Sequence, residues 1–181
     1  MISVRPATVG DSDQIARAHI RTWQAAYAHV LPAAYLASFD PSVWAERRRR
    51  QIAEQTPPDE CFVGEFNDEI VGHATVGRFR GGSGVRDPAV GEIIAIYVVP
   101  EHWSSGVGPA LLRTGIDHLA GYGLGEIRLW VVADNPRARR FYERFGFVAD
   151  GGSRLVPVGA DYPDAMPVEH IRYTLHDARH A

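Results

Sequence analysis

Apolar residues recur along the chain at two different spacings, and the spacing separates helices from strands. Spacings of three and four residues place side chains on one helical face and predict helices at residues 11–30, 41–54, 107–120 and 135–145. At the start of the first helix, Asp11 and Gln14 have the spacing of a capping box. At the start of the second, Asp40 followed by Pro41 predicts an N-cap and a proline at the first helical position.

Shorter runs that alternate or are continuously apolar predict strands at residues 2–5, 61–66, 70–79, 93–99, 127–132, 147–149 and 169–175. Asn67-Asp68 is typical of a hairpin turn between two of them. Gly72 inside a strand indicates a bulge or a close backbone approach. Residues 80–89 and 151–167 are expected to be irregular, because glycine and proline interrupt both.

The order of these elements predicts the fold class. Strands joined as a hairpin come first, and a strand–helix–strand crossover follows in the middle of the chain, so we expect an α/β fold with a mixed sheet flanked by helices. A chain of 181 residues without a long linker is expected to form a single domain over residues 1–181.

Composition excludes several classes of function but does not identify the activity. A net charge of −3 gives no general attraction to nucleic acid or acidic membranes, and no apolar run reaches the roughly 20 residues of a membrane span. The start of the chain has no secretory signal, and a single cysteine, Cys61, rules out an internal disulfide. We therefore expect a soluble, cytoplasmic protein without membrane or nucleic-acid partners. The arginine run 47–50 is interpreted as a solvated helix face paired with Glu46 rather than an RNA site.

The stretch from Glu92 to Leu112 carries the first chemical signal. A buried strand leads through Pro100 and a turn of serine and glycine directly into a helix. A helix N-terminus presents unpaired backbone N–H groups and the positive end of its dipole, which together favour an anion. Gly106 and Gly108 remove side chains where a ligand would approach the backbone.

Two motifs around this turn resemble those of the GNAT superfamily of N-acetyltransferases. The first is a strand ending in Val-x-Pro followed by Gln/Arg-x-x-Gly-x-Gly/Ala, which stands here as Val98, Pro100, Trp103, Gly106 and Gly108. The second is Asn-x-x-Ala-x-x-Phe-Tyr-x-x-x-Gly-Phe, which is matched without a gap at Asn135, Ala138, Phe141, Tyr142, Gly146 and Phe147. The Gly pair alone is a weak signal, whereas two motifs separated by a strand are a strong one.

The resemblance implies a GNAT-like fold, acetyl-CoA as co-substrate and no metal. In the family, the pyrophosphate of coenzyme A lies on the helix N-terminus, and its pantetheine amides pair with the edge of a strand that splays and bulges. Residues implied to bind it are Ile96, Tyr97, Val98, Trp103, Ser104, Ser105, Gly106, Val107, Gly108, Pro109, Asn135, Ala138 and Tyr142.

The turn departs from the family pattern at one position with a chemical consequence. Trp103 stands where the family has glutamine or arginine, and Ser104 and Ser105 follow it, so one fixed positive charge is missing. We hypothesise that a nearby arginine compensates, and the candidates are Arg113, Arg137, Arg139 and Arg140.

Two residues are candidates for proton transfer, and each has a structural alternative. By resemblance, Tyr142 donates a proton to the departing thiolate, whereas the alternative is a core tyrosine that packs with Phe141 and Phe145. Glu92 is a candidate base for an acceptor amine, and the alternative is an exposed strand-end residue. The implied reaction is direct attack by the amine, because Cys61 lies in the wrong part of the chain to carry an acyl group.

The acceptor is expected to be a small-molecule or peptide amine, and its site is expected opposite the cofactor. By resemblance, it lies between the first two helices and the two predicted loops. Aromatic candidates to line it are Trp23, Tyr27, Tyr35, His73 and Tyr162. The sequence does not decide between a monomer and a homodimer.

Three rival functions follow from the same residues. A dinucleotide enzyme would need a third glycine where this chain has Leu111. A non-catalytic acyl-CoA-binding module is the serious alternative, because the Trp103 turn is atypical. An RNA binder built on the arginine run is the most remote. The eight histidines show no metal-ligand spacing, so no metal is expected.

Overall fold

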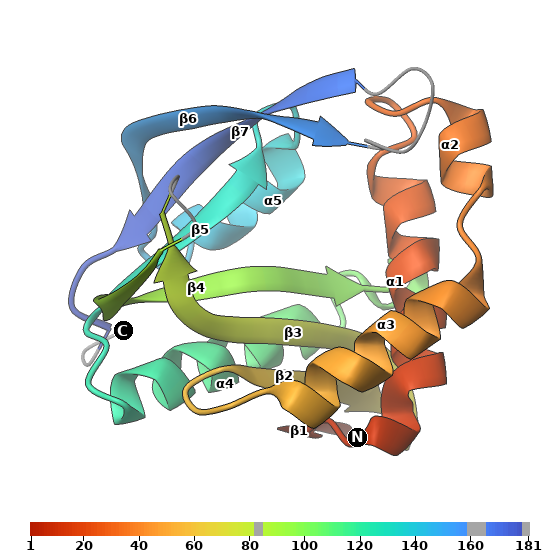
Figure 1. The fold of residues 1–181 in the computed structure, drawn as a ribbon, viewed down its shortest axis with the longest axis horizontal. Coiled ribbons are helices and arrows are strands. Elements are labelled where there is room, and N and C mark those ends of the chain that lie inside the picture. Colours follow the sequence, from red (N-terminus) through yellow and green to blue (C-terminus); the bar gives the residue numbers. More distant parts are fainter. Residues whose placement is uncertain (82–84, 159–165, 179–181) are drawn as a thin grey trace.

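The computed structural model describes residues 1–81, 85–158 and 166–178. Within them one mixed sheet has the strand order β1-β2-β3-β4-β5-β7-β6 (Figure 1). Its strands are β1 (Ile2–Pro6), β2 (Glu60–Phe66), β3 (Glu69–Arg80), β4 (Arg86–Val98), β5 (Glu126–Val132), β6 (Val148–Val158) and β7 (Met166–Leu175). Strands β4 and β5 are parallel and the other neighbours are antiparallel, so the expected mixed sheet is confirmed.

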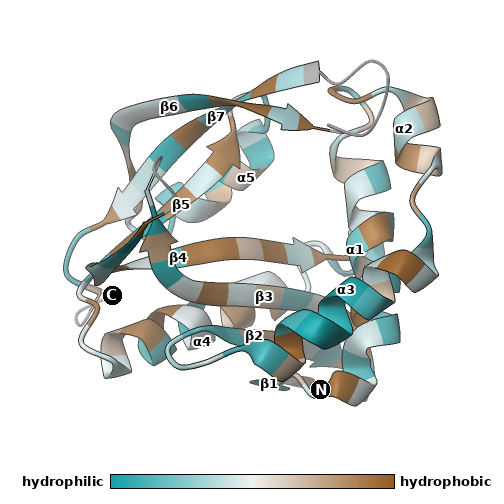
Figure 2. Ribbon diagram, viewed as in Figure 1, coloured by the Kyte–Doolittle hydropathy of each residue, from teal (hydrophilic) through white to brown (hydrophobic). Residues whose placement is uncertain are grey.

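The helices cover both faces of this sheet. They are α1 (Ser12–Ala26), α2 (Ala33–Ala37), α3 (Pro41–Glu54), α4 (Val107–Gly121) and α5 (Pro136–Glu143), with short 3-10 turns η1 (Val9–Asp11) and η2 (Pro100–His102). Helix α4 packs against β1 to β4, while α1 contacts β3 and β4 and packs beside α3. The outer face of α3 is strongly hydrophilic (Figure 2), as the arginine run requires. Arg48 is half-buried, however, and donates to the Thr75 hydroxyl at 3.2 Å.

The ends of the helices agree only partly with the sequence. The Asp40 carboxylate accepts from the backbone N–H of Ser42 at 2.8 Å, which confirms that N-cap. The expected Asp11–Gln14 capping box is wrong. The Asp11 carboxylate instead accepts from Arg5 at 2.8 Å and from the backbone N–H of Thr8 at 2.7 Å, which stabilises the 3-10 turn before α1. Helix α1 ends at Ala26 rather than near residue 30.

Both predicted loops contain strand residues, and residues 82–84 and 159–165 of them lie outside the described residues. β3 continues to Arg80 and β4 already begins at Arg86, so only a short connection remains of the expected loop over 80–89. Residues 151–158 belong to β6, which pairs with β7 through Arg154↔His170 and Val156↔Val168. Local propensity is low there, but the partner strand supplies the backbone hydrogen bonds, and the edge position of β6 tolerates Pro157.

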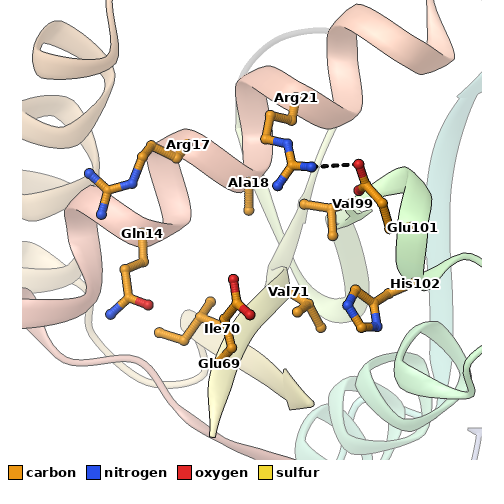
Figure 3. Close-up of a pocket in the computed structure, with 10 residues that line it drawn as sticks. All are labelled: Gln14, Arg17, Ala18, Arg21, Glu69, Ile70, Val71, Val99, Glu101 and His102. Atoms are coloured by element: carbon orange, nitrogen blue, oxygen red, sulfur yellow. Dashed lines mark hydrogen bonds and ion pairs between the residues drawn. The ribbon is translucent and has the colours of Figure 1, made fainter. Parts of the chain in front are cut away.

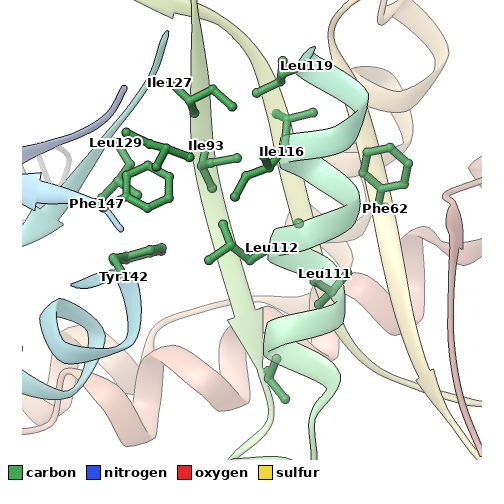
Figure 4. Packing of buried hydrophobic residues seen from close by; sticks show 14 of the residues in the cluster. Phe62, Ile93, Leu111, Leu112, Ile116, Leu119, Ile127, Leu129, Tyr142 and Phe147 are labelled. Atoms are coloured by element: carbon green, nitrogen blue, oxygen red, sulfur yellow. The ribbon is translucent and has the colours of Figure 1, made fainter. Parts of the chain in front are cut away.

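The main core lies between α4 and the strands above it. Buried leucine and isoleucine side chains from α4, β4 and β5 interdigitate, and Tyr142 and Phe147 close one end (Figure 4). Each large apolar side chain buried here contributes about 1.5–3 kcal/mol to folding. Cys61 is buried in a second cluster. At Gly72 an added Cβ would lie 2.7 Å from the Tyr97 carbonyl oxygen, so the expected close backbone approach is confirmed.

Strands β4 and β5 separate after a short paired stretch, and this separation positions the site. They pair only from Val90↔Glu126 to Ile93↔Leu129, and beyond these residues the two strands diverge (Figure 1). On its other side β4 carries a bulge at the same level, because Val76 pairs with Ile93 while Thr75 pairs with Ala95. The open edge of β4 from Ile94 onward is therefore free to meet a ligand.

Candidate active site

A cavity of about 1240 Å³ occupies the gap between the diverging strands. It holds most of the predicted site residues, namely Glu92, Ile96, Tyr97, Val98, Trp103, Ser104, Gly106, Gly108, Pro109, Asn135, Ala138 and Tyr142. Two predicted residues do not line it. The Val107 side chain is fully buried in the core, and the Ser105 hydroxyl donates to the His102 carbonyl at 2.7 Å.

The cavity has two parts that are built from different elements. We call the part at α4 and α5 the glycine-turn half, and its residues include Gly106, Gly108, Arg113, Arg137 and Phe141. We call the part at α1, strands β5 to β7, Arg80 of β3 and Glu92 of β4 the aromatic half, and its other residues include Trp23, Tyr27, Trp130, Arg154 and His170. The open edge of β4 runs between them.

The glycine turn leaves backbone donors at the start of α4. Gly106 is the N-cap and has a φ of 98°, a left-handed conformation that favours glycine. At Gly108 an added Cβ would come no closer than 3.7 Å to the Phe141 ring, so packing within the protein does not require glycine there. Because Gly108 lines the cavity and lies in the first helical turn, its missing side chain leaves room for a ligand at the helix N-terminus.

The edge of β4 offers alternate backbone groups to the cavity. The N–H of Val99 donates to the Val71 carbonyl of β3 at 2.9 Å, so the backbone of Val99 faces β3. Alternation along the strand then turns the backbone of Ile96 and Val98 toward the open edge, and that of Tyr97 toward β3. Tyr97 can therefore contribute its side chain to the cavity but not its backbone.

Trp103 makes a contact that the sequence did not predict. Its indole N–H donates to the Val98 carbonyl at 2.6 Å, and the Arg137 guanidinium lies 3.4 Å from the centre of its ring. The indole thus occupies one of the outward acceptors of the β4 edge, and Arg137 holds it in place by a cation–π contact.

Tyr142 both packs in the core and lines the cavity. Its ring packs edge-on against Phe141 and Phe147 and belongs to the main core. It also lines the cavity, where α5 faces β4 (Figure 4). Burial raises the pKa of its hydroxyl well above the usual value, so the group stays protonated at neutral pH and can act as a proton donor.

Glu92 is buried, so the alternative of an exposed strand-end residue is wrong. Because β4 begins at Arg86, Glu92 lies within the strand between Gly77 and Arg128, and only 5% of its surface is exposed. Its Oε2 accepts from the Arg80 backbone N–H at 3.1 Å and from Arg80 Nε at 3.4 Å. The carboxylate lines the aromatic half of the cavity with its charge balanced by one arginine.

Comparison with known proteins identifies the family. Residues 21–147 match the Acetyltransferase (GNAT) family. The chain belongs to the GNAT family. It is 30% identical over 179 residues to YuaI, an uncharacterized N-acetyltransferase of Bacillus subtilis (strain 168), and the match covers 94% of this chain and 98% of that protein.

Solved structures share the fold. The PaiA N-acetyltransferase of Thermoplasma acidophilum, in complex with coenzyme A, superposes with a TM-score of 0.71 at 16% identity and covers 95% of this chain and 98% of its own. YncA of Salmonella typhimurium, with its cofactor acetyl-CoA, gives 0.69 at 19% identity and covers 97% and 94%. The family and fold expected from the two motifs are thereby confirmed.

Only some of the candidate arginines reach the cavity of this GNAT protein. Arg113 and Arg137 line the glycine-turn half, and so does Arg144, which the sequence reasoning missed. Arg139 instead donates to the Tyr173 hydroxyl at 3.2 Å, and Arg140 does not line the cavity. Residues two apart on a helix do not share a face, so Arg139 points away from the side that Arg137 occupies and contacts Tyr173 instead.

The aromatic candidates divide in the same way. Trp23 and Tyr27 line the cavity, whereas Tyr35 and His73 do not, and Tyr162 lies outside the described residues. His73 is fully buried beneath Tyr97 and stacks on His19 with ring centres 5.5 Å apart. None of their four ring nitrogens has a hydrogen-bond partner within the described chain. Burial, reinforced by nearby Arg48, lowers the pKa of both, that of His19 to about 3, so both rings are neutral at pH 7.

A second cavity of about 410 Å³ lies between α1, β3 and η2 (Figure 3), and His102 lines both cavities. Arg21 pairs there with Glu101 at 2.5 Å, and the remaining lining mixes charged and apolar residues. Among the described residues, no group of histidine, cysteine, aspartate and glutamate side chains could hold a metal. No helix in the same part of the chain is long and apolar enough to cross a membrane.

Proposed function

We propose that this GNAT protein transfers an acetyl group from acetyl-CoA to a primary amine by direct attack. One observation supports this most strongly. A single cavity joins a helix N-terminus with a glycine turn, an unpaired strand edge, and two side chains suited to proton transfer, Glu92 and Tyr142. These are the parts needed to bind a long anionic thioester and to deliver an amine to it.

The glycine-turn half fits coenzyme A. The backbone N–H groups of Val107 and Gly108 would hold the pyrophosphate, with positive charge from Arg113, Arg137 and Arg144 replacing the arginine or glutamine that Trp103 displaces. The outward backbone groups of Ile96 and Val98 would pair with the pantetheine amides. Because the pyrophosphate is bound mainly by backbone, the atypical turn retains the donors that matter most.

Glu92 and Tyr142 would move the protons of the reaction. An ammonium cannot attack a thioester, so Glu92 removes one proton from the acceptor before or during attack. Arg80 engages only its Oε2, which leaves Oε1 without a partner among the described residues. The bulge at Ile94 would turn a backbone N–H toward the thioester oxygen. Tyr142 gives a proton to the departing sulfur, and the second proton lost by the amine nitrogen restores its hydroxyl.

A second function, a non-catalytic acyl-CoA-binding module, is favoured by one observation. The Trp103 indole already occupies the outward carbonyl of Val98, which acetyl-CoA would need for a full set of pantetheine contacts. A protein that only senses acyl-CoA could use this indole as the element that ligand binding displaces.

A thiol-release assay with acetyl-CoA and a broad panel of amines separates the two functions. The enzyme proposal expects thiol release with at least one amine and a large loss in Tyr142→Phe, while acetyl-CoA affinity is retained. Tyr122→Phe is the matched control, because Tyr122 is 51% exposed and lies outside the cavity. Tight acetyl-CoA binding with no release for any amine would favour the binding module.

A further inference from the structure

The aromatic half of the cavity contains more hydrogen-bond donors than the described chain satisfies. The Arg154 guanidinium of β6 lies 4.2 Å from the ring centre of Trp130 and forms no ion pair with a described residue. The indole N–H of Trp130 is buried and also lacks an acceptor there. Arg154 is exposed, so water solvates it in the free protein, but a guanidinium held on the face of an indole is well placed to bind a ligand that brings anionic oxygen atoms.

The charge balance points in the same direction. Glu92 is the one carboxylate among the described residues that line this half, and its Oε2 is already engaged by Arg80. Arg154 lies close enough to interact electrostatically with both, and it leaves the surroundings net positive. Polyamines and aminoglycosides carry several positive charges and would meet two guanidinium groups here, so the lining selects against them.

An apolar wall lies in the same half, beyond the Arg154↔His170 pair along β6 and β7. Leu31, Val132 and Val168 form a buried cluster, with Val30 and Val158 packed against it, and all five line the cavity. Such a wall accepts a hydrophobic side chain and offers nothing to a polar one.

We infer that the acceptor is a free amino acid with an apolar side chain, an assignment that rests on the proposed function. Its carboxylate binds the Arg154 guanidinium on the face of Trp130, in the two-pronged geometry that arginine favours. Its side chain packs on the apolar wall, and its amine is directed to Glu92. Arg154 is therefore a specificity-determining residue.

Matched amines test this assignment. The kcat/KM values of L-leucine, L-leucinamide, 3-methylbutylamine and spermidine are compared in the parent enzyme, Arg154→Met and Arg50→Met. Arg50 is the control, because its side chain is 68% exposed on α3. We expect L-leucine to exceed L-leucinamide at least about tenfold in the parent, the contribution of one charged hydrogen-bonded pair. Arg154→Met should abolish the preference by lowering the L-leucine value alone, and Arg50→Met should retain it.

Two results overturn the inference. One is a parent enzyme with a higher kcat/KM for L-leucinamide or spermidine than for L-leucine. The other is an Arg154→Met variant whose kcat/KM falls by the same factor for all four amines. Calorimetric titration of L-leucine into the protein saturated with coenzyme A gives an independent answer if no thiol is released. Binding that Arg154→Met weakens tenfold supports the site even if the proposed catalysis fails, and absence of binding to the parent rejects it.

Discussion

The two halves of the cavity are built on different principles. The glycine-turn half comes from consecutive residues, since Val98 to Pro109 and Asn135 to Phe141 supply most of it. It works largely through backbone groups at a helix N-terminus and a strand edge. The aromatic half is assembled from side chains of α1, β3, β4, β5, β6 and β7, which are far apart in the sequence. The first half can bind a ligand common to a whole family, and the second can change its acceptor through single side chains.

The largest expected effect comes from Tyr142, which lies where the halves meet. Tyr142→Phe should lower kcat about 10²–10⁴-fold, the usual contribution of a positioned proton donor, and should leave acetyl-CoA affinity nearly unchanged. The missing hydroxyl is the only change, and the ring still packs against Phe141 and Phe147. Steady-state kinetics together with acetyl-CoA titration measure the two quantities. An unaltered kcat would leave Tyr142 a packing residue.

The next effect isolates the glycine-turn half. Gly108→Val should weaken acetyl-CoA binding about 100-fold, because its side chain would cover the backbone donors at the start of α4 and remove one or two charge-assisted hydrogen bonds. Gly121→Val is the control, since nothing lies within 4 Å of a Cβ at that position of the same helix. Equal dissociation constants for the two variants, measured by calorimetry, would show that the ligand does not approach Gly108.

Substitution of Glu92 tests whether the aromatic half removes the proton from the acceptor. Glu92→Gln should lower kcat/KM at least about tenfold at pH 7, and the deficit should shrink at higher pH, where more of the acceptor amine is already neutral. Circular dichroism must show that the buried amide is accommodated beside Arg80. If the variant and the parent have superimposable pH–rate profiles, Glu92 has no part in proton removal.

A prediction about stability concerns the two histidines packed against Tyr97. Tyr97 of the cavity rests on His19 and His73, whose pKa values are lowered by burial, so both rings must be neutral in the folded state. Each therefore stabilises the fold fully above the unfolded pKa near 6.5, and this stability is lost as pH falls below it, by up to about 1.4 kcal/mol per pH unit. Urea midpoints at pH 7.5 and 5.0 should differ less in His19→Leu than in the parent. The exposed His176→Gln should behave as the parent, and an identical slope in His19→Leu would contradict the assignment.

The same division explains what the sequence could predict. The turn at Gly106 and the start of α5 at Asn135 are local, because their neighbours along the chain determine their backbone, and both were found where expected. The burial of Glu92 depends on where β4 begins, which its pairing with β3 determines. Arg154 came to the cavity through the pairing of β6 with β7, in a segment whose glycine and proline suggested a loop. Long-range strand pairing, unlike helix capping, cannot be recognised from a short window of sequence.

The smallest effect concerns Trp103, where the glycine-turn half departs from its family. Trp103→Phe removes the N–H that occupies the Val98 carbonyl but keeps an aromatic face for Arg137. If the indole competes with the pantetheine arm, the variant should bind acetyl-CoA more tightly, by about fivefold for one neutral hydrogen bond of roughly 1 kcal/mol. Calorimetry at a single ionic strength is sufficient to detect this change. Weaker binding would instead mean that the indole and Arg137 form part of the binding surface. The positive charge that the family has at position 103 would then be replaced by the stacked Trp103–Arg137 pair rather than by an arginine alone.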